Sequence, residues 1–170
     1  LATSKNKSLT DMKKLTFVGL VLIKDEVRKE AIEGVELVNN AHIKTIMITG
    51  DNKDTATSIA KEVGIYKPGN LVLTSEELNK LTDEELKSKI FDISVVARSL
   101  PSDKSRLVRM CQDMDLVVGM TGDGVNDAPA IRSANIGVAM GSGTDTAKET
   151  ASMIIIDDNF KSIVAGIKEG

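Results

Sequence analysis

Short apolar runs that each end in a glycine and an acid constrain the fold of this chain more than any other feature. The run 116–119 leads into TGDGVNDAP at 121–129, and the run 43–48 leads into TGDN at 49–52. Glycine lets bare backbone approach an anion, and acids four residues apart can point at one metal ion. One such loop would equally fit an ordinary turn whose Asp or Asn caps a helix. Two of them favour a site for magnesium and phosphate.

Apolar runs alternate with segments of helical periodicity along most of the chain. We predict helices near 27–38, 55–63, 102–112, 126–133, 145–150 and 160–168, with two further helix starts at 74–77 and 82–85. We predict strands at 17–23, 43–48, 71–73, 93–97, 116–120, 136–140 and 153–156. This order predicts an α/β fold, a Rossmann-like parallel sheet with helices on both faces. Residues 1–14 lack periodicity and are expected to be a disordered or frayed lead-in, and 15–170 to form one domain.

Composition narrows the class of protein. With 41% apolar and 28% charged residues, the 170 residues suffice for one core. A net charge of -3 and 2% aromatic residues argue against nucleic acid as a partner. The apolar stretches fall short of the roughly 20 residues of a membrane helix, so we expect a soluble chain. The single cysteine, Cys111, cannot form an internal disulfide, and a reducing compartment is expected.

Three motifs together carry a family resemblance. TGDGVNDAP at 121–129, TGD at 49–51 and SDK at 102–104 resemble the phosphorylation domain of P-type cation-transporting ATPases, a branch of the haloacid dehalogenase-like superfamily. The resemblance runs from about residue 15 to residue 170. It implies phosphoryl transfer with Mg²⁺ and ATP as cofactors, in which the protein positions groups and neutralises charge.

The resemblance assigns roles residue by residue. The Thr49 hydroxyl and the Gly50 amide would bind phosphoryl oxygens, and Lys104 would supply a fixed positive charge. Asp123 would bind Mg²⁺ directly, with Asp127 near the metal. A lone lysine at a helix start is more often solvated, which is the competing interpretation of Lys104. The catalytic set implied by the resemblance is Thr49, Gly50, Asp51, Lys104, Asp123, Asn126 and Asp127, with Asn126 and Asp127 also holding the site in shape.

Two further segments resemble nucleotide contacts of the family. Asp25 and Arg28 lie in a segment similar to the DPxR motif, and Arg98 follows the strand 93–97. Glu26 stands where the family has proline, so the turn is less rigid than in the family. A surface Asp–Arg pair at a helix start is the alternative.

The family's DKTGT segment, which carries the phosphorylated aspartate, occurs nowhere in the 170 residues. The resemblance then implies part of a pump whose remainder supplies nucleotide-binding, actuator and membrane domains, so the chain would be a cytoplasmic domain of an integral membrane protein. Without the acceptor aspartate the isolated chain is expected to have no ATPase turnover. The missing strand would lie between the two TGD strands, and unpaired edges there would favour self-association.

Several short segments indicate which ion the pump would transport. The segments 23–28, 97–104 and 157–164 resemble calcium-transporting pumps of the plasma-membrane type, and 140–144 is closer to the endoplasmic-reticulum type. Calcium is therefore favoured, and the subtype stays open. Two alternatives remain for the function: a soluble haloacid dehalogenase-like phosphatase, or a non-catalytic module that binds magnesium or phosphate.

Overall fold

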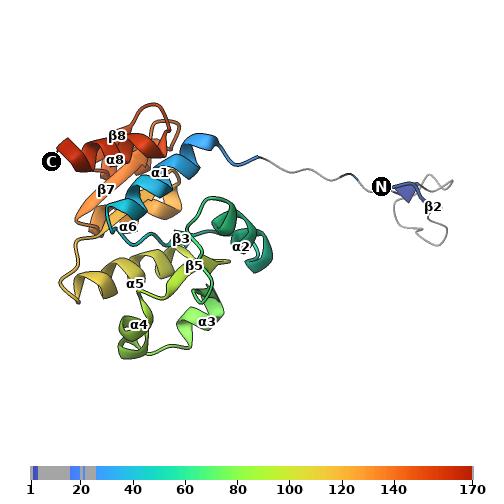
Figure 1. Cartoon of the computed structure of the whole chain (residues 1–170), viewed down its shortest axis with the longest axis horizontal. Helices are drawn as coiled ribbons and strands as arrows, with labels where there is room; N and C mark the ends of the chain where they lie inside the picture. The colour runs from blue at the N-terminus through green and yellow to red at the C-terminus, as the bar shows by residue number, and fades with distance from the viewer. Residues whose placement is uncertain (1, 4–15, 20, 22–25, 170) are drawn as a thin grey trace.

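The computed structural model describes residues 2–3, 16–19, 21 and 26–169, within which strands and helices alternate (Figure 1). The strands are β1 (Ala2–Thr3), β2 (Thr16–Phe17), β3 (Met47–Ile48), β4 (Leu71–Thr74), β5 (Ile93–Ala97), β6 (Gly119–Gly122), β7 (Ile136–Met140) and β8 (Met153–Ile155). The helices are α1 (Lys29–Asn40), α2 (Lys53–Glu62), α3 (Ser75–Asn79), α4 (Asp83–Lys89), α5 (Pro101–Gln112), the 3₁₀ turn η1 (Val125–Asp127), α6 (Ala128–Ser133), α7 (Asp145–Thr150) and α8 (Phe160–Glu169).

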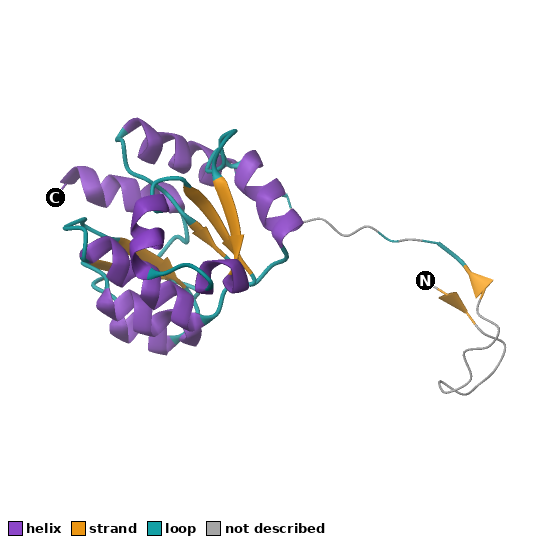
Figure 2. Ribbon diagram, turned by 90° about the horizontal axis from the view of Figure 1, so that it is seen from below, coloured by secondary structure: helices purple, strands orange, loops and turns teal. Residues whose placement is uncertain are grey.

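The strands of the main body form two parallel three-stranded sheets. Their orders are β3-β5-β4 and β6-β7-β8. Helices lie on both sides of the strands (Figure 2), and all five residues of β5 are buried. This confirms the predicted α/β class, because a parallel strand covered on both faces is apolar along nearly its whole length; the one polar residue of β5, Ser94, is hydrogen-bonded to Ile65 O and Asn70 Oδ1. In the described part of the chain, β3 and β6 each pair with a strand on one side only.

Helix α5 joins the two sheets. Leu107 and Met110 belong to the core cluster around β5, whereas Val108 packs in the cluster with Met120 of β6. Neighbouring residues on one helix therefore contact two cores, because successive side chains point about 100° apart. The first turn of α5 thus has a fixed place between the two sheets.

Local signals in the sequence fix several helix ends. Thr74 and Thr82 form the predicted capping boxes with Glu77 and Glu85, each accepting a backbone N–H at 3.2 Å. Gly64, at φ 83°, ends the helical segment of α2 as predicted. These ends follow from side chains within a few residues.

Two predicted strands are shorter or shifted. The predicted strand 43–48 is reduced to β3, because the Ile43 N–H donates to Val38 O and so belongs to the turn that leaves α1. The predicted strand 116–120 becomes β6 at 119–122, since the N–H groups of Leu116 and Val118 are used by Cys111 O and Asn135 Oδ1. Backbone donors committed elsewhere cannot join a ladder.

The predicted parallel strand 17–23 is wrong over its described residues. Only Thr16–Phe17 is a strand, and it pairs antiparallel with Ala2–Thr3, apart from the main body (Figure 1). Phe17, Val18 and Val21 are 70%, 60% and 67% exposed, so the body does not cover this apolar run. Residues 20, 22 and 23 of the predicted strand lie outside the described residues.

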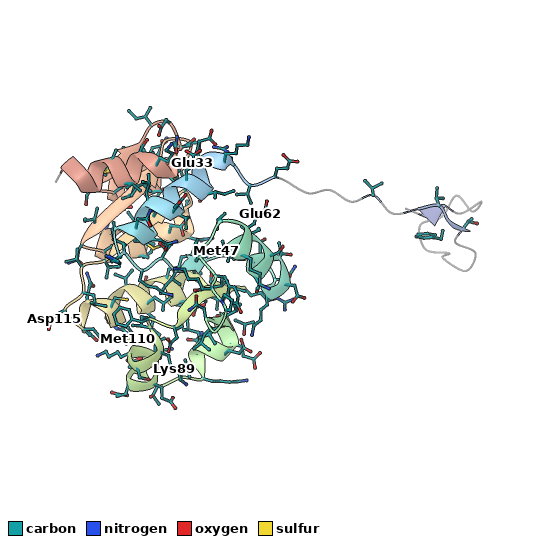
Figure 3. All side chains as sticks on the ribbon, viewed as in Figure 1. Glu33, Met47, Glu62, Lys89, Met110 and Asp115 are labelled. Atoms are coloured by element: carbon teal, nitrogen blue, oxygen red, sulfur yellow. The ribbon has the colours of Figure 1, made fainter. Side chains whose placement is uncertain are left out.

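Helices α1 and α8 pack closely against each other. A Cβ on Gly34 would lie 2.7 Å from Cδ1 of Phe160, so the glycine sets the distance between the helices. The Lys161 ammonium donates to Glu33 at 2.6 Å across the same contact, and Figure 3 shows Glu33 on this side of α1. The end of the chain is thereby held to the first helix of the body.

Candidate functional site

The loop after β6 is organised around one buried carboxylate. Asp127 is 6% exposed and lies at the end of η1. Its Oδ2 accepts the N–H groups of Asp123 at 3.2 Å and Gly124 at 3.1 Å. A Cβ on Gly122 would lie 2.4 Å from Cβ of Asp127, so the loop closes this tightly only around glycine. The sequence TGDGVND therefore folds into a self-bonded turn at the carboxyl end of a strand.

Lys104 of α5 completes the surroundings of Asp127. Its Nζ donates to Asp127 Oδ1, and the two side chains are 17% and 8% exposed. The lysine side chain is thus mostly buried and paired with a carboxylate. The competing interpretation, an ordinary solvated lysine at a helix start, is wrong. The motif resemblance placed both residues in one site but did not predict that they pair, and nothing local in the sequence links positions 104 and 127.

Opposing influences act on the pKa of Asp127. Burial raises the pKa of this carboxyl, whereas the hydrogen bond from Lys104 and the backbone N–H of Gly124 lower it. The net pKa is below the ordinary value, so the group is a carboxylate at neutral pH. Both of its oxygens are occupied by the donors described above.

The loop after β3 is open by comparison. The Thr49 hydroxyl donates to Asp51 Oδ2 at 3.1 Å and accepts the Asp51 N–H at 3.1 Å. Asn52 caps α2 by accepting the Thr55 N–H at 2.9 Å. A Cβ on Gly50 would meet nothing within 4 Å. The loop leaves room for a ligand beside its glycine.

The segment that follows β5 connects the two loops. The Arg98 N–H donates to Asp51 O and the Ser99 N–H to Thr49 O, both at 2.9 Å. Arg98 adopts φ 50°, an uncommon left-handed conformation for a side chain of its size. Six residues after Arg98, Lys104 contacts Asp127. One segment therefore brings the two TGD loops to the same edge of the fold, as predicted.

Asp123 has an exposed carboxylate that could hold a metal ion. It is exposed at the end of β6, and its carbonyl oxygen accepts the Thr144 N–H at 2.8 Å, which fixes the backbone. The described residues contain no group of three or more His, Cys, Asp or Glu able to hold a metal ion. Mg²⁺ commonly takes one or two carboxylates together with water and phosphate oxygens, so this donor set fits Mg²⁺ as a partial site. Asn126, in η1, has an exposed side chain.

Arg28, one of the predicted nucleotide residues, is not brought together with these loops by any contact that the structure describes. Arg28 lies beside the start of α8, in a hollow of about 340 Å³ that it shares with Asp157 and Asp158. Asp25 lies outside the described residues. Only Arg98, through its backbone, contacts a TGD loop.

Asp158 is a structural residue of the site region that we did not predict as such. Its Oδ1 accepts the Ser142 N–H at 3.0 Å, and this bond lowers the pKa of the carboxyl, helped by the charge of Arg28. Ser142 belongs to the loop that continues to Thr144 and so to Asp123. Asp158 adopts φ 52°, a conformation that the sequence pattern does not reveal.

The fold and the two loops define a class of hydrolase. A family profile described as haloacid dehalogenase-like hydrolase matches residues 3–135, and a second with the same description matches 108–167. The chain belongs to this family.

Proteins similar to the chain are ion-transporting ATPases. "Calcium-transporting ATPase 1" of Lactococcus lactis subsp. lactis (strain IL1403) is 49% identical over 170 residues, which cover 98% of this chain and 19% of that protein. "Calcium-transporting ATPase 4, plasma membrane-type" of Arabidopsis thaliana is 50% identical over 150 residues, 88% of this chain and 15% of that protein. A crystal structure of a zinc-transporting PIB-type ATPase in the E2.Pi state is 31% identical with a TM-score of 0.64, covering 85% of this chain and 19% of that one.

The matches confirm the resemblance to P-type ATPases. The chain spans 15–19% of the length of these relatives. Within the described residues, no helix is both long and apolar enough to cross a membrane.

Proposed function

We propose that this chain is part of the cytoplasmic phosphorylation domain of an ATP-driven cation pump, and that it works with Mg²⁺ and ATP. The observation that carries the proposal is the enclosed Lys104–Asp127 pair next to the exposed carboxylate of Asp123. A fixed cation and a metal-binding carboxylate at one edge of a parallel sheet suit the transfer of a phosphoryl group.

Each site residue then has a task. Lys104 neutralises charge on the phosphoryl group, and the Thr49 hydroxyl and Gly50 N–H donate hydrogen bonds to its oxygens. Asp123 holds Mg²⁺, which when bound spreads the negative charge of the phosphates. Asp127 orients Lys104 and the backbone of the β6 loop, and Asn126 and Asp51 support the two loops. Asp25, Arg28 and Arg98 are proposed to contact ATP.

A strand placed between β3 and β6 would complete the site. Both strands have a free edge within the described residues, and the chain contains no DKTGT segment. We propose that this strand carries the acceptor aspartate and joins the two sheets into one. The isolated chain therefore lacks the nucleophile and has no ATPase turnover. Its free edges favour self-association; a strictly monomeric mass in light scattering at high concentration would contradict this.

Calcium is the proposed cargo of the whole pump, in a membrane whose identity stays open. The proposal rests on identities of 49% and 50% to two calcium-transporting ATPases, against 31% to the zinc-transporting one. The transport site lies in membrane-spanning parts of such pumps, so the cargo is tested on the full-length protein by comparing Ca²⁺ and Zn²⁺ uptake into vesicles. Uptake of Zn²⁺ but not Ca²⁺ would overturn it.

Isothermal calorimetry on this chain tests the site. We expect Mg²⁺ to bind, more tightly with beryllium fluoride present, and Asp123→Asn to abolish the binding. Asp115→Asn is the matched control, because Asp115 is an exposed carboxylate at the outer end of α5 (Figure 3). Equal binding by wild type and Asp123→Asn would show that the metal is placed wrongly. If wild type does not bind, the same titration is repeated after a DKTGT segment has been added.

A further inference from the structure

A fully buried carboxylate precedes the site lysine. Asp103, 0% exposed, is the third residue of α5 and the direct neighbour of Lys104. Its Oδ2 accepts the Leu100 N–H at 2.8 Å, and its Oδ1 accepts the amide of Asn79 at 2.9 Å. No ion pair among the described residues includes Asp103. A buried carboxylate without a cation is costly, so its presence calls for a reason other than core stability.

Asp103 holds the first turn of α5. Leu100, the residue before the helix, has no side-chain oxygen with which to cap it, and Pro101 lacks an N–H. The carboxylate of Asp103 reaches back to the Leu100 N–H, while the Asp103 N–H donates to Leu100 O at 3.0 Å. The conformation of the turn therefore depends on this one side chain.

Asn79 fixes the carboxylate from the other side. It is the last residue of α3, and its Nδ2 also donates to Ser75 O at 2.8 Å. The contact joins two segments that are 24 residues apart. Asn79 thereby sets where the first turn of α5 lies relative to α3.

A second polar contact joins α5 to the same region. Arg106 donates to Leu78 O at 3.0 Å, to Leu81 O at 2.7 Å and to Asp83 Oδ1 at 2.7 Å. This contact lies farther along α5 than Lys104 and does not touch the first turn. It therefore supplies a comparison that shares the two packed elements but not the neighbouring lysine.

We propose that Asp103 is a positioning residue, held by Asn79, that directs the Lys104 ammonium at the site; the proposal rests on the proposed role of Lys104 as the phosphoryl-binding cation. Consecutive helical side chains point about 100° apart, so the turn that anchors Asp103 against α3 aims Lys104 at Asp127. Loss of the anchor lets the turn rotate or fray. A displacement of about 1 Å in a catalytic group can cost about a hundredfold in rate, which gives such an anchor functional value.

The test measures how well Lys104 is protected from an amine-reactive acetylating reagent. The rate of labelling at Lys104 is read by peptide mass spectrometry relative to the exposed Lys67. We expect Asp103→Asn to raise the relative labelling rate several-fold. The substitution places an N–H donor opposite the N–H donor of Asn79, so the hydrogen bond between the two side chains is lost. Asn79→Ala removes the donor on the other side of the same contact, and we expect it to raise the relative rate as well.

One control separates positioning from general loosening. Arg106→Gln removes the other contact between α5 and the α3–α4 region, and it should lower stability to urea without exposing Lys104. If it exposes Lys104 as much as Asp103→Asn does, the proposal is overturned. Should Asp103→Asn not fold, Asn79→Ala tests the same contact, and unchanged protection in that variant would also overturn it.

The outcome is independent of the proposed function. Labelling is measured without Mg²⁺ or phosphate, so it reports the placement of Lys104 alone. The calorimetry described above reports ligand binding in wild type. If wild type fails to bind even after a DKTGT segment has been added, but labelling responds as expected, the proposed role of Lys104 fails while its positioning by Asp103 stands.

Discussion

The two TGD loops begin with the same three residues but differ in how far they are packed. The loop after β6 is closed on itself, with Asp127 buried, bonded to two backbone N–H groups and paired with Lys104. The loop after β3 is exposed, and its main internal contact is between Thr49 and Asp51. One loop is therefore preformed by its own packing, whereas the other depends on what lies next to it.

The glycines of the two loops differ in the same way, in how closely neighbouring atoms approach them. A side chain at Gly122 would collide with Asp127, but a side chain at Gly50 would enter open space. Glycine is thus needed after β6 for the fold itself. After β3 its proposed use is to admit a ligand, and substitutions can separate these two uses.

Removal of the buried carboxylate should have the largest effect. Asp127→Ala leaves the Lys104 ammonium and two backbone N–H groups without their acceptor, and breaking a buried pair in this way costs about 3–5 kcal/mol. Urea denaturation measures the loss. Asp51→Ala, in the exposed loop, should cost much less. Equal losses for the two variants would show that the loops do not differ as described.

A methyl group in the closed loop should have the next largest effect. Gly122→Ala places Cβ 2.4 Å from Asp127 Cβ, and overpacking of this kind costs about 1–3 kcal/mol. Gly124→Ala is the control within the same loop, because its Cβ would lie 3.5 Å from Asp127 Oδ2, an ordinary contact. Thermal unfolding compares the two variants. Similar midpoints would contradict the close approach at Gly122.

Lowering the pH should destabilise the folded chain as the carboxylate of Asp127 in the closed loop is protonated. Because the pKa of this carboxyl in the folded chain is below its unfolded value of about 3.9, its contribution to stability is full above that value. The contribution is lost as the pH falls through the lower folded pKa. Asp127→Asn should therefore flatten the dependence of the unfolding free energy on pH below about 4, relative to wild type and Asp115→Asn. An unchanged slope would show that the carboxylate is not stabilised by its donors.

Gly50→Ala should change stability least, by no more than about 0.5 kcal/mol, because its Cβ meets no neighbour. Under the proposed function it should nevertheless weaken binding of magnesium with beryllium fluoride in calorimetry, since the methyl group occupies the approach to the Gly50 N–H. Unchanged binding would argue against a phosphoryl group at this position. A large loss of stability would instead show that the loop is packed in solution.

Much of the fold follows from local pattern. The mostly apolar segment 93–97, interrupted only by Ser94, predicted a buried strand, and the Thr–Glu pairs at 74–77 and 82–85 predicted the starts of two helices. The strand 17–23 was mispredicted because its apolar composition contains no information about which surface covers it. The roles of Asp103 and Asp158 were missed for a related reason, since their partners lie 24 and 16 residues away.

The sequence by itself determined the class of fold, the family and the two glycine-and-acid loops. Their causes lie within a few residues: side-chain periodicity, capping and the conformational freedom of glycine. Only the tertiary structure decided that Lys104 meets Asp127 and that Asp103 is buried against Asn79. These features depend on which surfaces the chain brings together, and the energy of such contacts arises only when distant segments exclude water from one another.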